Sequence, residues 1–387
     1  MGFTKVTGLG AACSTGLEKE KIFDSCLQGE SAVGHDGLAS ISEDAWKYLF
    51  ASAPETFRKS KCTVLSFCAV KEALDESGWT QDDLSQCGFI FASTTSQIDQ
   101  WEKKLPFYKN ISVEKIESGV ADQSLGSPLF ALAEYFGIGG PKTLFSSSCS
   151  ASLQALSIAN LWIKSGKVKR CLVGATELNN DLTKAGFGSL RLLSKTNACP
   201  FDKNRSGINL GEGSAFLCLE DSSLASTPSW GFIRGIGLGS DAYHPTAPHP
   251  EGRGSRESMT MALREAHVDV LQVPWIYAHG TGSIANDLSE AKAIESLFPQ
   301  SPLVSSTKSL HGHTLGACGV LESCLGLMAM QRSQILPTFN FKEADPKMNI
   351  QVCGTRTEKN FSTFLKNSLG FGGINVSILF AKHLETP

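Results

Sequence analysis

The sequence has no CxxC pair, no uninterrupted apolar run long enough to span a bilayer, and no block of like charges. Its twelve cysteines are scattered over 387 residues. This spacing indicates neither a disulfide framework nor a zinc ribbon, and most of the thiols should be reduced and buried. The formal net charge is only -3. With no basic excess, we expect neither nucleic acid nor a membrane surface as a partner.

The amino-terminal stretch MGFTKVTGLGAACS lacks the basic and apolar regions of a secretory signal. Val6 also breaks the myristoylation pattern, which needs Ser or Thr at that position. The most apolar later stretch, LGACGVLESCLGLMAM, is interrupted by Glu322 and is too short to cross a membrane. It predicts a buried helix, and we expect a cytoplasmic globular protein.

Strand-like apolar runs alternate with helical patterns along the whole chain, which predicts an α/β fold. Six of these runs precede loop or helix signals: CGFIFAST, PKTLFSSS, KRCLVGAT, WGFIRGIG, VPWIYAHG and PLVSSTKS. The small, polar stretch ASTPSW at residues 225–230 predicts a boundary between two halves, residues 1–230 and 231–387. Each half contains a strand, a polar turn and a helix, so a duplicated architecture with a site between the halves is expected.

Cys149 stands between two runs of hydroxyls in SSSCSASLQAL, where a strand-like stretch gives way to a helical one. The apolar face of that helix would consist of Leu153, Leu156, Ala159 and either Leu161 or Trp162, with Gly166 as the C-cap. Free N–H groups and the helix dipole at the first turn predict a lowered thiol pKa, and they could hold an oxyanion. From these residues alone, a nucleophile and a buried structural cysteine both remain open.

His279 ends an apolar strand and precedes a Gly-Thr-Gly-Ser loop that carries the hydroxyls of Thr281 and Ser283. Asn286 or Asp287 is then expected to cap a helix. A histidine beside a flexible loop is a suitable catalytic group. A structural histidine with satisfied hydrogen bonds fits this stretch equally well.

Lys308, His311 and His313 lie within six residues in STKSLHGHTLGACGVLES, and Glu322 follows on the next helix. His311 and His313 could be metal ligands, but no Cys, Asp or Glu cluster with familiar ligand spacing accompanies them, so we predict no metal. An acid–base role requires His279 and His313 to lie close to each other and to Cys149.

The carboxyl-terminal stretch KNSLGFGGINVSILFAKH places Phe371 among glycines between two apolar runs. Such an aromatic residue is either a core residue of a tight turn or a movable gate over a pocket. The stretches GLGAACS and GIGLGS lack the full dinucleotide-binding fingerprint. Their glycines are expected in strands and turns.

These stretches, in this order, resemble the elongating β-ketoacyl-ACP synthases, ketosynthases with the thiolase fold, where ACP is acyl carrier protein. The resemblance rests on SSCSAS, HGTGSIAND, STKSLHGHTLGACGVLES and NSLGFGGINVSILF, with further likeness in VTGLGAACSTG, PFDKNRSGINLGEGSAFLCLE and GSDAYHPTAPHPEG. It covers almost the whole chain. It implies two thiolase-like halves in a five-layered αβαβα sandwich.

The resemblance also implies the reaction. Cys149 would accept an acyl chain from ACP as a thioester, with its oxyanion held by the backbone N–H groups of Cys149 and Phe371. His279 and His313 would then promote decarboxylation of malonyl-ACP and stabilise the enolate that attacks the acyl-cysteine. The chemistry suits a soft nucleophile and two neutral imidazoles.

Five residues receive supporting roles from the resemblance. Lys308, paired with Glu322, would organise the charge around His313 without reacting itself. Thr281 and Ser283 would bind the phosphopantetheine arm of the carrier protein. Phe371 would gate acyl entry. No cofactor is implied, because the substrates are carried on ACP.

The chain departs from the family pattern at a few positions. Ser150 follows the cysteine where alanine or threonine is more usual, Ser148 precedes it where alanine is common, and Ser283 replaces a frequent threonine. The chain is also shorter before Cys149 and near residues 197–200. These features resemble the compact synthases of aryl-polyene and other specialised polyene clusters.

Two alternatives remain beside the elongating enzyme. A non-catalytic chain-length-factor-like subunit would keep the fold, but such subunits usually lack the cysteine. A thiolase or initiating synthase that uses coenzyme A thioesters is disfavoured by the two histidine motifs. The family dimerises, so we expect a homodimer or a heterodimer with a chain-length-factor-like subunit.

Overall fold

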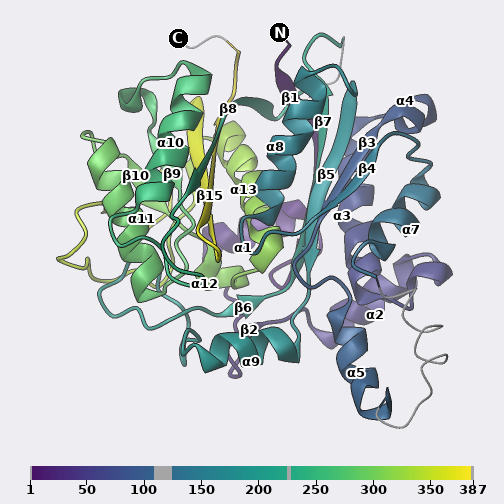
Figure 1. Ribbon diagram of the computed structural model, residues 1–387, viewed down its shortest axis with the longest axis horizontal. Helices are drawn as coiled ribbons and strands as arrows, with labels where there is room; N and C mark the ends of the chain where they lie inside the picture. The colour runs from purple at the N-terminus through teal and green to yellow at the C-terminus, as the bar shows by residue number, and fades with distance from the viewer. Residues whose placement is uncertain (1, 109–123, 225–227, 385–387) are drawn as a thin grey trace.

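The computed structural model describes residues 2–108, 124–224 and 228–384. Two layers of strands enclose helices α8 (Ala151–Lys164) and α13 (Cys318–Arg332), and further helices cover the outer faces of both strand layers (Figure 1). The predicted α/β class and αβαβα layering are confirmed.

The first strand layer consists of five strands in the spatial order β1-β7-β5-β3-β4. Their bounds are Thr4–Cys13 (β1), Gly88–Ala92 (β3), Lys142–Phe145 (β4), Arg170–Glu177 (β5) and Gly213–Asp221 (β7). β3 pairs in parallel with β4 and β5, whereas β7 runs antiparallel to β5 and β1. The strands β1, β3 and β7 are buried along their whole lengths, as expected for strands covered on both faces.

The second strand layer has the spatial order β12-β10-β9-β14-β15-β8. Its strands are Gly231–Ser240 (β8), Trp275–Tyr277 (β9), Leu303–Ser305 (β10), Gln351–Val352 (β12), Thr363–Gly370 (β14) and Ile374–Ala381 (β15). Two short two-stranded sheets flank the layers: β2 (Leu38–Ala39) with β6 (Leu210–Gly211), and β11 (Gln334–Ile335) with β13 (Thr357–Glu358).

The two layers meet at a short seam, where residues 4–6 of β1 pair with residues 231–233 of β8. Through this seam the described strands form one eleven-stranded sheet. The predicted boundary at 225–230 lies just before β8, and its residues 225–227 are outside the described residues.

The outer helices approach their strands very closely in both halves. An added Cβ at Gly10 of β1 would lie 1.9 Å from the carbonyl oxygen of Ala69 in α3 (Lys61–Ser77). An added Cβ at Gly237 of β8 would lie 1.8 Å from that of Ser258 in α10 (Arg253–Ala266). Only glycine fits at such distances. Gly10 and Gly237 thus lie in strands, as predicted, and the structure adds that they allow close strand–helix packing in the same way in each half.

The remaining helices lie around these layers. They are α1 (Lys19–Gln28), α2 (Glu43–Ser52), α4 (Gln81–Gln86), α5 (Ile98–Tyr108), α7 (Ser127–Phe136), α9 (Asp181–Ser189), α11 (Ile284–Leu297) and α12 (Lys308–His311). Short 3-10 turns are η1 (Glu55–Phe57), η3 (Val270–Gln272) and η4 (Leu315–Ala317).

The two central helices form the middle layer. The residues of α13 from Cys318 to Met330 are all buried, which confirms the predicted buried helix. In α8 the predicted face is buried at Leu153, Leu156 and Ala159, but Leu161 is 58% exposed and does not belong to it. Of the helices in the described ranges, none is long and apolar enough to cross a membrane.

Candidate active site

Cys149 lies between the end of β4 and the start of α8, two residues before that helix begins. Ser148, just before it, has a φ of 47°, a left-handed conformation that is uncommon outside glycine. The carbonyl oxygen of Cys149 accepts a hydrogen bond from Ser368 Oγ at 2.9 Å. The backbone N–H of Phe371 points at the Cys149 sulfur. The turn thus holds the thiol at the base of a pocket, where it is only 6% exposed.

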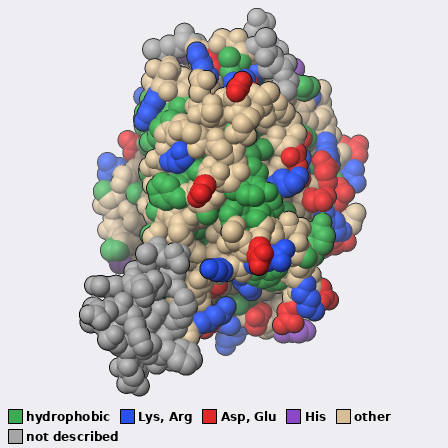
Figure 2. All heavy atoms as spheres, turned by 90° about the vertical axis from the view of Figure 1, so that its right-hand side faces the viewer, with side chains coloured by type: hydrophobic (Ala, Val, Ile, Leu, Met, Phe, Trp, Pro, Cys, Tyr) green, Lys and Arg blue, Asp and Glu red, His purple; other side chains and the backbone are tan. Residues whose placement is uncertain are grey.

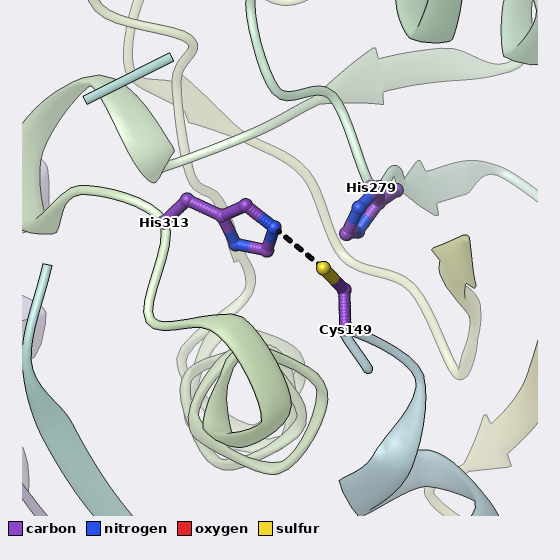
Figure 3. Close-up of side chains that lie close together, drawn as sticks. All are labelled: Cys149, His279 and His313. Atoms are coloured by element: carbon purple, nitrogen blue, oxygen red, sulfur yellow. Dashed lines mark hydrogen bonds between the residues drawn. The ribbon is translucent and has the colours of Figure 1, made fainter. Parts of the chain in front are cut away.

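The structure brings His279 and His313 together at this thiol, although 34 residues separate them in sequence. His313 Nε2 lies 3.1 Å from Cys149 Sγ (Figure 3). The two imidazole rings have centroids 5.1 Å apart and are nearly perpendicular, at 80°. His279 follows β9 and His313 follows α12, so both rings come from the carboxyl-terminal half and Cys149 from the amino-terminal half. The expected site between the halves is therefore present.

The thiol does not have the lowered pKa that its helix-start position predicted. Burial raises the pKa of the Cys149 thiol well above its ordinary value, and this outweighs the nearby Lys308 charge and the Phe371 N–H. The prediction was wrong because it counted the N–H groups but not the loss of solvent around the sulfur.

Both imidazoles are held neutral. Burial first, and then the Lys308 charge, lower the pKa of His313 to about 3. The same two causes lower the pKa of His279 well below its ordinary value, with further contributions from His313 and Lys366. A neutral thiol therefore rests against two neutral imidazoles, which suits the two as hydrogen-bond donors to a developing oxyanion.

Lys308 and Glu322 form a buried ion pair close to the histidines. Lys308 Nζ also donates to the backbone carbonyl of His279 at 2.7 Å. Burial lowers the pKa of Lys308, but Glu322 overcomes that effect and raises it. The predicted pairing is thus present, and it fixes the main chain of one histidine.

A second buried lysine shares the same carboxylate. Lys366 of β14 is fully buried, and its Nζ lies 2.6 Å from Glu322 Oε2. Burial would raise the pKa of Glu322, but Lys308 and Lys366 together lower it to about 2. Sequence reasoning missed Lys366. A lysine amid the apolar run of a strand, beside the motif NSLGFGG, was the available signal.

The loop after His279 is held by two buried carboxylates on α11. Glu290 accepts the backbone N–H groups of His279 and Gly280 at 2.8 and 2.9 Å. Asp287 accepts those of Thr281 and Gly282. Asp287 was expected to be a possible helix cap, but α11 begins at Ile284 after Ser283, so Asp287 sits within the first turn and binds back to the loop. Glu290 was not predicted.

Thr281 and Ser283 line the same pocket as Cys149 and the two histidines, and their hydroxyls are 3.0 Å apart. This open pocket has an empty volume of about 900 Å³. A second pocket, of about 830 Å³, lies towards α9 and shares Cys149, Phe187 and Phe371 with the first. Phe371 occupies the turn between β14 and β15 and stacks on Phe187 of α9, with ring centroids 5.4 Å apart. The aromatic pair thus lies where the two pockets meet.

Of the two histidines first considered as metal ligands, His311 is engaged elsewhere. Both ring nitrogens of His311 are engaged, with Thr307 Oγ1 and with the Gly312 carbonyl, each at 2.8 Å. In the described residues the set whose donor atoms could share an ion is Cys149, His279 and His313, within 4.8 Å of one another. These are the groups that the resemblance assigns to acyl chemistry, and the absence of a metal stays a prediction.

Comparison with protein families matches two descriptions in succession. Residues 5–225 match the beta-ketoacyl synthase N-terminal domain, and residues 230–342 match the C-terminal domain. The chain belongs to the beta-ketoacyl synthase family. The resemblance read from the sequence motifs is thereby confirmed, and so is the thiolase-type fold.

Individual relatives cover nearly the whole ketosynthase chain. A protein of Synechocystis named 3-oxoacyl-[acyl-carrier-protein] synthase 2 is 29% identical, over 98% of this chain and 97% of its own. A protein of Vibrio harveyi with the same name is 28% identical, over 98% of each chain. Among solved structures, a beta-ketoacyl synthase from Burkholderia phymatum superposes with a TM-score of 0.88 at 26% identity, covering 99% of this chain and 100% of the other. A ketosynthase solved with its chain length factor from Xenorhabdus doucetiae has a TM-score of 0.84 at 26% identity, covering 99% and 98%.

Proposed function

We propose that this ketosynthase is an elongating β-ketoacyl-ACP synthase, an acyltransferase that condenses an acyl-enzyme thioester with malonyl-ACP. One observation carries the proposal: a buried thiol from one half lies 3.1 Å from one imidazole and beside a second from the other half, at the base of an open pocket. Relatives named 3-oxoacyl-ACP synthase support the same activity.

The first step is acyl transfer to Cys149. As the sulfur attacks the carbonyl carbon of acyl-ACP, the thiol proton passes by way of His313 Nε2 to the departing phosphopantetheine sulfur, so that no free imidazolium accumulates. The N–H of Phe371 points at the Cys149 sulfur, which supports assigning it, with the N–H of Cys149, to the oxyanion that forms beside that sulfur. Because the raised pKa keeps the resting thiol protonated, the sulfur can act as a nucleophile only if it loses this proton as it attacks.

The second step uses the imidazoles as donors. Malonyl-ACP enters with its thioester oxygen near His279 and His313, and carbon dioxide leaves as the enolate oxygen forms. The enolate carbon attacks the acyl carbon, a carbon–carbon bond forms, and the Cys149 sulfur departs as a thiolate that takes up a proton from solvent to restore the resting thiol. Neutral imidazoles serve this step because each can place an N–H on the enolate oxygen, and their lowered pKa keeps them neutral at physiological pH.

The two pockets suit two different parts of the substrate, the phosphopantetheine arm and the acyl chain. We assign the pocket with Thr281 and Ser283 to the phosphopantetheine arm, because it reaches the surface past two hydroxyls suited to an amide-rich chain. The pocket towards α9, lined by Leu190, Leu315 and Phe187, suits the acyl chain. Phe371 stands between them, which supports its role as the gate.

The proposed partners are ACP and a second ketosynthase-type subunit. Strand β4 ends the sheet, and one of its edges is unpaired among the described strands. Figure 2 shows hydrophobic side chains gathered in the middle of the face that Figure 1 has on its right, where β3, β4 and α7 lie. A likeness to a ketosynthase solved with its chain length factor makes a heterodimer an alternative to a homodimer.

A chain-length-factor-like role without catalysis is the rival function. The geometry favours the enzyme, because a subunit that only shapes a pocket has no need of a thiol, two neutral imidazoles and two buried lysines at one point.

The test is acyl loading of purified protein. Incubation with a panel of acyl-ACPs should add one acyl mass to the wild-type chain by intact-mass spectrometry, and Cys149→Ala should add none. Cys171→Ala is the matched control, because it removes an equally buried thiol from β5, away from the pocket. Loading of Cys149→Ala, or no loading of the wild type alone or with a co-expressed partner, would contradict the proposal.

A further inference from the structure

Lys366 is the buried charged group in the site for which the reaction as described has no use. Its ammonium lies among four oxygens: the Tyr277 carbonyl at 3.3 Å, the Ala278 carbonyl at 3.1 Å, the Asn367 carbonyl at 2.6 Å and Glu322 Oε2 at 2.6 Å. An ammonium has only three N–H donors. The surrounding oxygens, which we call the oxygen cage, therefore offer one more acceptor than Lys366 can fully use.

The oxygen cage is joined to the catalytic histidine through the main chain. Lys366 binds the carbonyls of Tyr277 and Ala278, and Lys308 binds the carbonyl of the next residue, His279. Glu322 bridges the two ammonium groups with its two oxygens. Three successive carbonyls leading into His279 are thus fixed by two cations on one carboxylate.

Charge balance gives a reason for the second cation. Both oxygens of Glu290 accept N–H groups from the same segment, at His279 and Gly280, and Asn367 Nδ2 donates to Glu290 Oε1 at 3.2 Å. If Lys366 loses its charge, Lys308 is therefore the one cation left among the described residues to balance the two buried carboxylates, Glu290 and Glu322. An uncompensated charge in the interior is strongly unfavourable, and the segment would shift to relieve it.

We propose that Lys366 is a positioning residue, a cation tethered in the oxygen cage that sets the place of His279 for the decarboxylation and condensation step. The interpretation of the condensation rates rests on the proposed function. The oxygen cage consists only of carbonyl and carboxylate oxygens, the ligand type that hard cations take. A shortened side chain at this position should therefore leave a site that a free ammonium or potassium ion can fill.

The experiment compares Lys366→Ala with Lys366→Met in buffers that contain tetramethylammonium, ammonium or potassium at equal ionic strength. In tetramethylammonium, Lys366→Ala should lose about 100-fold in condensation rate, the size expected when one oxyanion donor is misplaced. Acyl loading of Cys149, which does not use His279, should change less than about threefold. Ammonium or potassium should restore at least about tenfold of the condensation rate.

Lys366→Met is the control for ion entry. It removes the charge but fills the space, so its condensation activity should be lost and should not be restored by any of the three cations. The condensation rate of the wild type should be the same in all three. His279→Ala should reproduce the selective loss of condensation, also without restoration. Full condensation by Lys366→Ala in tetramethylammonium, or a loss that no small cation reverses, would overturn the proposal.

A readout without activity separates the two proposals. If the oxygen cage takes up ammonium, the thermal midpoint of Lys366→Ala should rise in ammonium relative to tetramethylammonium, and those of the wild type and Lys366→Met should not. A wild type that neither loads nor condenses contradicts the proposed function alone. An unchanged midpoint of Lys366→Ala contradicts the oxygen cage alone.

Discussion

The residues at the centre of this site are governed by burial more than by their helix positions. Cys149 sits where N–H groups would stabilise a thiolate, yet loss of solvent raises its pKa. The same burial lowers the pKa of His279 and His313. All three groups are thus neutral at rest. The enzyme therefore begins its cycle without the thiolate–imidazolium ion pair that many cysteine enzymes use.

This neutral resting state has a measurable consequence for alkylation of Cys149. Since only the thiolate reacts, the rate of reaction with iodoacetamide should rise about tenfold per pH unit between about pH 6 and pH 9, without a plateau. A time course of intact mass measures the rate, with Cys149→Ala reporting the background from the other thiols. A plateau reached near neutral pH would show instead that His313 holds the sulfur as a thiolate.

Site residues could be predicted from the sequence where they stand in a motif, and could not where their role depends on tertiary packing. Cys149, His279, Lys308 and His313 stand in motifs whose order is readable along the chain, and the structure brings them together. Lys366 acts through a contact with a carboxylate 44 residues away, so it had no motif of its own. The raised thiol pKa is a property of the surrounding packing, which local sequence does not contain.

At the scale of elements, the strands were predicted well because parallel strands buried on both faces leave near-continuous apolar runs. β3 and β9 fall within the predicted stretches, and β5 extends one residue beyond its stretch, to Glu177. The start of α11 was harder, because Asp287 is a good cap residue whose carboxylate is used by the loop at Thr281 and Gly282 instead. These contacts of Asp287 with the loop are tertiary contacts, which helix-capping preferences in the local sequence do not predict.

The unpaired edge of β4 makes a prediction about assembly. Phe89 N–H donates to the Pro141 carbonyl and Ser93 N–H to the Phe145 carbonyl. Alternation along the ladder therefore turns the N–H of Leu144 away from β3, towards the free edge. If a second subunit extends the sheet there, Leu144→Pro should abolish dimerisation because proline has no N–H to donate.

Leu144→Ala is the matched control for this edge, since it loses the same side chain but keeps the N–H. Light scattering after size-exclusion chromatography should find the wild type and Leu144→Ala as dimers, and Leu144→Pro as a monomer. Dimers of all three would place the subunit contact elsewhere.

At the scale of the whole molecule, the two halves meet at a layer of buried polar and charged groups as well as at apolar helices. Glu322, Lys308 and Lys366 lie behind the catalytic groups, inside the same core as α8 and α13. The duplicated plan was readable from the repeated order of strand, turn and helix. The seam between β1 and β8 was not, because it pairs only residues 4–6 with 231–233.

Burying imidazoles at this junction predicts sensitivity to acid. His279, His311 and His313 all have a folded-state pKa below the ordinary value, and that of His311 is lowered to about 4 by burial. Below about pH 6.5 these histidines are protonated in the unfolded chain but stay neutral in the folded protein. Their contribution to the free energy of unfolding is therefore complete above about pH 6.5 and falls as the pH drops.

Each histidine should lower the free energy of unfolding by about 1.4 kcal/mol per pH unit below that point. Urea unfolding at a series of pH values measures the slope, and His311→Gln, which leaves the catalytic pair intact, should reduce it by the contribution of one histidine. If His311→Gln left the slope unchanged, His311 would be protonated in the folded protein, which would contradict burial as the cause of neutral imidazoles at this junction.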